Sequence, residues 1–209
     1  MTPPVTPEKT SPIVGRSRFG HNLLFLTKFF RHGTKIASVW PSSRFMALAT
    51  LARVDWKVAK IIVELGAGTG PITAQIVERL LPQTRLLVIE HDPDFVKILQ
   101  QRFAGHKNVY IIEGDVAALS VILRGHAIGP HEVDYFVSGL ATPTLPDPVR
   151  HGMFDAVRQY LHPQGFFSNI TEFPWYYLRQ YRQWFSDVSF ELVPLNMPPG
   201  GVYHCRTIR

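Results

Sequence analysis

The sequence predicts an α/β fold: a mostly parallel, seven-stranded sheet with helices on both faces and an antiparallel final hairpin. Between about residues 60 and 170, short apolar runs typical of buried strands alternate with helical patterns, and this alternation produces a parallel sheet with right-handed crossovers. The first of these runs leads directly into a turn with three alternating glycines. The last two strand-like runs have no helix between them, so we expect them to pair as a hairpin.

Composition places the chain among globular, single-domain proteins. Its 209 residues are 45% hydrophobic and 18% charged, which suffices for a sizeable core. The one cysteine, Cys205, excludes an internal disulfide and suits a reducing compartment. The Pro/Thr-rich start lacks the apolar region of a signal peptide, and no run approaches the roughly 20 apolar residues of a spanning helix. We therefore expect a protein that does not cross a membrane.

Charge divides the chain into unequal parts. We expect a disordered arm over residues 1–18, a helical segment over 19–44 and the main domain over 45–209. Residues 1–60 hold ten Lys and Arg against two acids, whereas the rest has a net charge of −2. A basic N-terminal third implies a polyanionic partner at that end, either lipid head groups or nucleic acid.

The helical segment that begins at Phe19 is amphipathic. Its apolar residues fall in one arc of an ideal helical wheel and its basic residues gather on the opposite side. Such a helix either lies in a membrane interface with its aromatic face down or packs on the core of the protein with its basic face in solvent, and the pattern leaves both open. The candidate membrane-binding residues are Phe19, Leu23, Leu26, Lys28, Phe29, Phe30, Arg31 and Lys35.

A second helix is expected from Phe45 to about Val54. Ser42 or Ser43 can cap it, and its free amides would form an anion pocket with Arg44 beside it. Serine before a helix is usually only a cap, so a phosphate site at this point requires independent evidence for a phosphate-bearing substrate.

The first strand, over about residues 60–65, carries Glu64 and ends in the loop Gly66-Ala67-Gly68-Thr69-Gly70. Glycine permits the positive φ and the missing Cβ that a turn needs where backbone lies against a ligand. A dinucleotide fold places its third glycine one position later and seats a pyrophosphate on a helix dipole. S-adenosylmethionine (SAM) has no phosphate; its ammonium needs carboxylate and carbonyl acceptors, and its carboxylate needs amide donors. We therefore interpret Glu64 and the loop as a SAM site.

Acids follow the next two strands. After a helix over 71–81, the strand 85–90 ends in Glu90, about 20 residues beyond the glycines, where a carboxylate would accept from a ribose diol. His91 would border the same pocket, and Asp92 caps a helix over 93–103. The strand 109–112 leads into Gly114-Asp115-Val116, where the acid can accept the adenine amino group.

The remaining elements complete the sheet. A strand over 133–137 leads into Ser138-Gly139-Leu140. Further elements are expected at 147–161 (helix), 166–170 (strand), about 174–184 (Trp/Tyr-rich helix), and about 188–193 and 201–208 (strands).

In this order and at these intervals, Glu64–Gly70, Glu90-His91 and Gly114-Asp115-Val116 resemble the successive motifs of class I SAM-dependent methyltransferases. That resemblance covers about residues 45–209 and implies a Rossmann-like fold.

A narrower resemblance, to bacterial phospholipid N-methyltransferases, rests on residues 29–44, on 90–95 and on Val137–Leu140. It implies stepwise methylation of phosphatidylethanolamine toward phosphatidylcholine by a peripheral enzyme at the cytoplasmic membrane face. Ser138, Gly139 and Leu140 would position the acceptor, with Ser138 also beside the cofactor. These enzymes usually have proline where this chain has Ala141, and an aromatic where it has Glu172, so an ornithine-type aminolipid stays open as the substrate.

An RNA adenine N-methyltransferase and a SAM-binding membrane-associated protein without activity also stay open. Enzymes acting on adenine amines place Asn or Asp at the exit of the fourth strand, followed by Pro and an aromatic that stacks on the flipped base. Ser138-Gly139-Leu140 has neither feature, so we do not expect nucleic acid as the partner.

The acceptor amine must lose a proton before transfer, because a primary alkylammonium has a pKa of about 10. Glu172 or a phosphate of the substrate could accept it, and aromatic faces such as Phe173 could hold the methylated ammonium. No spacing of histidines suggests a metal, and we expect none. The candidate substrate-binding residues are Trp40, Ser42, Ser43, Arg44, Glu172, Trp175, Tyr176 and Tyr203.

Overall fold

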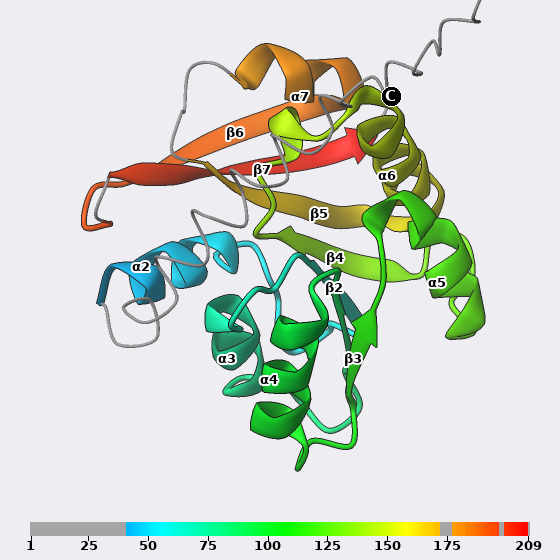
Figure 1. Cartoon of the computed structure of the whole chain (residues 1–209). Helices are drawn as coiled ribbons and strands as arrows, with labels where there is room; N and C mark the ends of the chain where they lie inside the picture. Colours follow the sequence, from blue (N-terminus) through cyan, green and yellow to red (C-terminus); the bar gives the residue numbers. More distant parts are fainter. Residues whose placement is uncertain (1–40, 172–176, 197–198, 209) are drawn as a thin grey trace, which may run out of the picture.

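The computed structural model describes residues 41–171, 177–196 and 199–208 (Figure 1), without the side chains of residues 41–43, 207 and 208. The predicted arm and nearly all of the predicted amphipathic segment lie outside these ranges. Several site candidates also lie outside them: Phe19, Leu23, Leu26, Lys28, Phe29, Phe30, Arg31, Lys35, Trp40, Glu172, Phe173, Trp175 and Tyr176. Within the ranges, no helix has the length and apolar character needed to span a membrane.

The sheet has seven strands in the order β3-β2-β1-β4-β5-β7-β6. The first five strands run parallel, and β7 pairs antiparallel with both β5 and β6. This confirms the predicted mostly parallel sheet with an antiparallel final hairpin. The strands are β1 (Ile61–Leu65), β2 (Arg85–Glu90), β3 (Val109–Glu113), β4 (Val133–Ser138), β5 (Leu161–Thr171), β6 (Phe185–Val193) and β7 (Gly200–Ile208).

Helices cover both faces of the sheet (Figure 1), and each face has its own apolar core. On one face, α2, α3 and α4 pack against β1 and β2, whose apolar side chains are almost fully buried. On the other, α5, α6 and α7 enclose a larger core rich in aromatic rings. The helices are α2 (Pro41–Thr50), α3 (Pro71–Val77), α4 (Pro93–Phe103), α5 (Leu119–Gly125), α6 (Asp147–Tyr160) and α7 (Leu178–Trp184), with short 3₁₀ turns at Val116–Ala118 and Thr142–Thr144.

Several elements differ from the predictions: α3 ends at Val77 and β6 begins at Phe185, and three further differences have a clear physical reason. Helix α2 begins at Pro41, which suits the first helical position because its missing N–H is not needed there; Ser42 and Ser43 therefore lie in its first turn instead of capping it. Helix α5 was not predicted, although a parallel crossover requires such a connection. Strand β5 begins at Leu161, because Leu161 already pairs with Val133 and a shift in register absorbs the polar residues that follow it.

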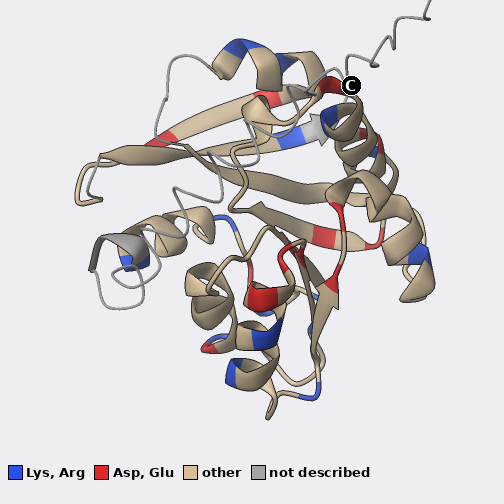
Figure 2. Cartoon of the chain, in the orientation of Figure 1, with Lys and Arg blue, Asp and Glu red and all other residues tan. Residues whose placement is uncertain are grey.

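The described part of the chain carries little net charge. Of the formal charge of +6, the first 40 residues alone contribute six Lys and Arg against one acid. Acidic and basic segments alternate over the rest of the molecule, with basic residues on α4 and α7 and acidic ones near the ends of β2 and β3 (Figure 2). The basic surface predicted at the N-terminal end thus belongs mainly to residues that the structure does not describe.

Candidate active site

The glycine loop follows β1 at the edge of the sheet where the parallel strands end. Gly66, Gly68 and Gly70 have φ angles of 70°, 56° and 83°, a left-handed region that strongly favours glycine. Gly66 is also crowded: a Cβ there would lie 2.2 Å from a side-chain carbon of Leu140. The loop therefore depends on glycine for its backbone conformation and for its contact with the exit of β4.

Glu64 lies under this loop and is fully buried. The Thr73 hydroxyl donates a 2.7 Å hydrogen bond to its Oε2 atom, whereas Oε1 has no partner among the described residues. Burial removes the carboxylate from water and raises the pKa of Glu64 to about 8. An unpaired buried carboxylate oxygen is costly, so a hydrogen-bond donor at Oε1, preferably a cation, would lower that cost.

Glu90 at the end of β2 holds the loop and its surroundings together. Its Oε2 accepts a 2.8 Å hydrogen bond from the Gly68 amide, and its Oε1 accepts from the amides of His91 and Asp92 at 2.8 and 2.9 Å. Each carboxylate oxygen can accept two hydrogen bonds. The predicted contact with a ribose diol thus remains available beside these backbone contacts.

The third acid, Asp115, caps the short helical turn after β3 by accepting from the Ala117 amide at 2.8 Å. Its side chain is exposed, and Val116 next to it is buried. Gly114 donates its amide to the backbone oxygen of Glu90 at 2.9 Å. The ends of β2 and β3 are therefore joined directly, and their two acids border the same edge of the sheet as the glycine loop.

These groups fit SAM. The unpartnered Oε1 of Glu64 suits the methionyl ammonium, and contact with it requires a rearrangement that uncovers this fully buried side chain. The glycine loop offers backbone to the methionyl part, and Glu90 and Asp115 offer acceptors to ribose and adenine. His91 is exposed beside Glu90, and Ala67 and Thr69 complete the loop. Among the described residues, no group of His, Cys, Asp and Glu could hold a metal ion.

The exit of β4, predicted to position the acceptor, lies at the same edge. Gly139 donates its amide to the backbone oxygen of Leu65 at 3.0 Å, and a Cβ on Gly139 would lie 2.6 Å from the Gly66 oxygen. Ser138 is fully buried, and its Oγ accepts from the Leu140 amide at 3.2 Å. The predicted Ser138-Gly139-Leu140 segment is thus packed directly against the cofactor loop.

Two residues that the sequence analysis did not select hold this exit in place. The Asn169 side-chain amide in β5 donates to the Leu140 carbonyl at 3.1 Å, and its oxygen accepts from the Thr142 hydroxyl. Both side chains are buried. Asn169 could have been noticed in the sequence, because it is a polar residue within the strand-like segment Phe166–Ile170. Buried strands tolerate a polar side chain only when it is hydrogen-bonded.

Of the substrate-binding candidates, the structure describes the side chains of Arg44 and Tyr203. Arg44 is exposed on the first turn of α2. Tyr203 is only 1% exposed and packs in the aromatic core with its ring 4.8 Å from that of Tyr181. A ring in that position cannot face a product ammonium without a rearrangement, so the structure offers no support for Tyr203 in an aromatic cage.

Comparison with known proteins supports the assignment of a SAM site. The family "Ribosomal RNA adenine dimethylase" matches residues 45–127, which form the cofactor half of the chain. The ornithine lipid N-methyltransferase of Singulisphaera acidiphila is 46% identical over 186 residues, covering 89% of this chain and 96% of that protein. The ribosomal RNA small subunit methyltransferase A of Mycoplasma capricolum is 35% identical over 68 residues, or 32% of this chain and 24% of that protein.

Solved structures show the same fold at low sequence identity. A 1,6-didemethyltoxoflavin-N1-methyltransferase from Burkholderia thailandensis, solved with S-adenosylhomocysteine, has a TM-score of 0.67 at 17% identity and covers 96% of this chain and 94% of that one. A phosphoethanolamine N-methyltransferase from Haemonchus contortus has a TM-score of 0.64 at 14% identity and covers 92% of this chain and 51% of that one. The fold, the cofactor site and the long match to one relative show that this chain is a class I SAM-dependent methyltransferase and belongs to the same family as the ornithine lipid N-methyltransferase of Singulisphaera acidiphila.

Proposed function

We propose that this protein transfers methyl groups from SAM to the primary amine of an aminolipid with an ornithine-type head group. The observation that carries the proposal is the 46% identity to a relative named for that activity, over 96% of its length. The match therefore includes the acceptor half of the chain as well as the cofactor half.

This proposal changes the head group that we expected. The sequence analysis favoured phosphatidylethanolamine and left an ornithine-type aminolipid open, and the named relative favours the aminolipid. The two lipids share a primary amine beside an anionic group, a phosphate in one and a carboxylate in the other. The exposed Arg44 on the first turn of α2 would suit either anion.

RNA is a weaker candidate acceptor. The matching RNA dimethylase family covers only residues 45–127, and this half contains the cofactor loop and the two acids after β2 and β3. The acceptor side begins at Ser138, outside that match. Its Ser-Gly-Leu exit lacks the acidic or amide side chain and the stacking ring that a flipped adenine requires.

SAM supplies a methyl group activated by its sulfonium. The protein has to place the acceptor amine in line with that methyl and to remove water from around it. The exit of β4 suits this task, because Gly139 contacts the Gly66 backbone and the Leu140 side chain covers the same glycine. Glu172 remains a candidate base, outside the described residues.

The proposal includes peripheral attachment to the cytoplasmic membrane face through residues 19–35. The basic charge of the first 40 residues supports it, because each Lys or Arg near an anionic bilayer contributes roughly 1 kcal/mol.

The test is methyl transfer from labelled SAM to three acceptors in parallel: ornithine lipid, phosphatidylethanolamine and bulk RNA. We expect label in ornithine lipid in mixed micelles, and none in RNA. Label in phosphatidylethanolamine alone would favour the phospholipid head group predicted from the sequence. Label in RNA alone would overturn the proposal.

A further inference from the structure

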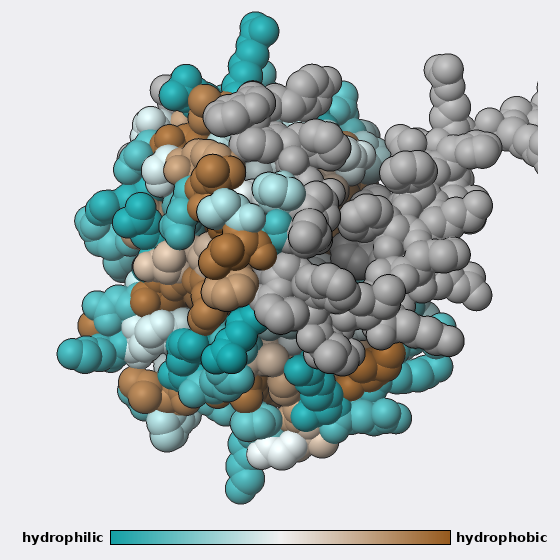
Figure 3. Space-filling model, turned by 90° about the vertical axis from the view of Figure 1, so that its left-hand side faces the viewer, coloured by the Kyte–Doolittle hydropathy of each residue, from teal (hydrophilic) through white to brown (hydrophobic). Residues whose placement is uncertain are grey.

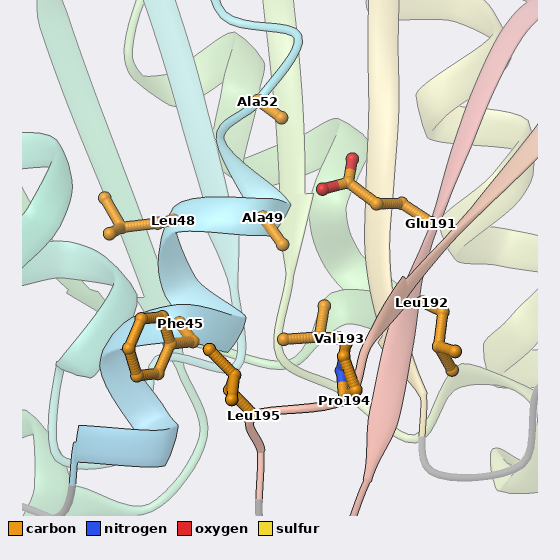
Figure 4. Close-up of a pocket in the computed structure, with 9 residues that line it drawn as sticks. All are labelled: Phe45, Leu48, Ala49, Ala52, Glu191, Leu192, Val193, Pro194 and Leu195. Atoms are coloured by element: carbon orange, nitrogen blue, oxygen red, sulfur yellow. The ribbon is translucent and has the colours of Figure 1, made fainter.

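An apolar groove runs along the outer side of α2, away from the cofactor loop. Side chains from α2 and from the end of β6 line it (Figure 4), and its volume is about 340 Å³. Three of its lining residues, Phe45, Leu192 and Leu195, are large hydrophobics that are 41%, 57% and 66% exposed. Apolar surface is also visible on this side of the molecule in Figure 3. These exposed apolar side chains lie together along one groove instead of being scattered singly over the surface, so the groove is a candidate for an apolar ligand.

Helix α2 separates this groove from the cofactor loop. Ala47 and Leu51 pack in the core that contains Ala67 of the loop. Phe45 and Ala49, on the opposite side of the helix, line the groove. A ligand in the groove is thus about one helix diameter, roughly 10 Å, from the loop.

We propose that this groove binds the acyl chain of the aminolipid substrate, an inference that rests on the proposed function. Charge supports this occupant. Phe45 and Leu195 lie together at the end of the groove where α2 begins (Figure 4). The positive end of the helix dipole and the exposed Arg44, which precedes Phe45 in the chain, therefore belong to this end and suit the anionic group of a zwitterionic aminolipid. The head group then passes the first turn of α2 toward the exit of β4.

The other end of the groove limits the length of the chain. Glu191 lies there opposite Ala52 (Figure 4), and its carboxylate is 3.4 Å from the buried His204. A carboxylate at this point stays in contact with water, so an apolar chain gains nothing by passing it. An apolar cavity of about 150 Å³ holds the six carbons of benzene, so by proportion this groove, at about 340 Å³, holds roughly fourteen carbons.

The groove therefore predicts a dependence on chain length. Each buried methylene contributes about 0.8 kcal/mol, or about fourfold in affinity. We expect the affinity for monomeric, single-chain aminolipids to rise by about fourfold per methylene until roughly fourteen carbons, and to level off beyond that length.

The location of the chain can be tested without turnover. Full-length protein with S-adenosylhomocysteine is irradiated with an ornithine lipid that carries a diazirine in the middle of its acyl chain, and the adducts are mapped by mass spectrometry. We expect adducts in residues 45–52 and 192–195, displaced by unlabelled lipid. Adducts confined to residues 1–40 would mean that the amphipathic segment holds the chain and would overturn the proposal, as would adducts scattered over the surface.

Variants at exposed positions provide a second test of the groove. Leu195→Asp, and Ala52→Phe as a second variant that fills the groove, should raise KM for a twelve-carbon substrate by about tenfold. Both variants should raise KM much less for an ornithine head-group analogue that has only an acetyl group, because such an analogue has no chain to occupy the groove. Val121→Asp, at a position that is 61% exposed and far from the groove in sequence and fold, is the matched control and should change neither.

The outcomes separate this inference from the proposed function. Groove adducts without methylation of any lipid would refute the proposed function and still support acyl-chain binding in the groove. Methylation with unchanged chain-length dependence in both groove variants would refute acyl-chain binding in the groove and still support the proposed function.

Discussion

Binding of SAM should release a proton, and Glu64 is the reason. Burial raises the pKa of this carboxyl group to about 8, so only about 10% of it is ionised at pH 7 and about 1% at pH 6. An ammonium placed against its unpartnered oxygen favours the ionised form and lowers the pKa. The association constant for SAM should therefore increase about tenfold from pH 6 to pH 7, with nearly one proton released per molecule bound at pH 7.

The raised pKa of Glu64 also lowers the stability of the protein without its cofactor. Below pH 4.5 the folded and unfolded states both hold the proton of Glu64, and there is no penalty. As pH rises through 4.5 toward 8, only the unfolded state loses it, so stability falls by about 3 kcal/mol by pH 7. Glu64→Gln should remove this penalty and raise the stability of the unliganded protein by up to about 3 kcal/mol, while weakening SAM binding.

Calorimetry in buffers of different ionisation enthalpy measures the released protons directly. Glu64→Gln should abolish both the release and the change in affinity between pH 6 and 7. Glu78→Gln, at an exposed glutamate where α3 ends, is the control and should behave as the wild type. Equal proton release in wild type and Glu64→Gln, or none in either, would refute this account of the site.

Three further predictions concern the cofactor loop, the β4 exit and the N-terminal segment. Gly66→Ala should abolish SAM binding in calorimetry because a φ of 70° strains a residue with a Cβ and because that Cβ would overlap the Leu140 side chain. Leu140→Ala should restore the part of the binding lost through the overlap; a double variant no better than the single would contradict this. Asn169→Leu should lower kcat by roughly tenfold or more with unchanged SAM affinity, since it frees the Leu140 carbonyl; a fall in SAM affinity alone would point to another role. Deleting residues 1–35 should abolish sedimentation with anionic vesicles and leave SAM binding intact; undiminished sedimentation would place that segment on the core.

The sequence predicted the sheet, and it predicted that the glycine loop and the acids after β2 and β3 follow its strands, because these signals are local. A glycine needed for a positive φ, as at Gly66, leaves its mark on the chain itself, and so does an acid that follows a buried strand, as Glu90 does. The residues between them form one helix and one strand, α3 and β2. Parallel strands bring their carboxyl ends to one edge, so Gly66 and Glu90 lie at the same edge of the sheet.

The acceptor side could not be predicted in the same way. Asn169 and Thr142 meet across 27 residues of chain, and neither carries a pattern that names its partner. Tyr203 was selected as a substrate-binding candidate because it is aromatic. It lies in β7, which is paired on both sides by β5 and β6, and its side chain is on the face of the strand that packs into the core. The groove beside α2 combines residues from opposite ends of the described chain, so only the fold brings them together.

The most direct test of the central claim is the lipid content of a host that makes ornithine lipids and no methylated lipids, with and without this gene. We predict ornithine lipids heavier by successive methyl groups on the head-group amine, present with the wild-type gene and absent with Gly66→Ala. Unmodified ornithine lipids alongside methylated phosphatidylethanolamine would contradict the proposed head group. An unchanged lipid profile, with soluble protein that still binds SAM, would contradict the claim that its acceptor is a lipid.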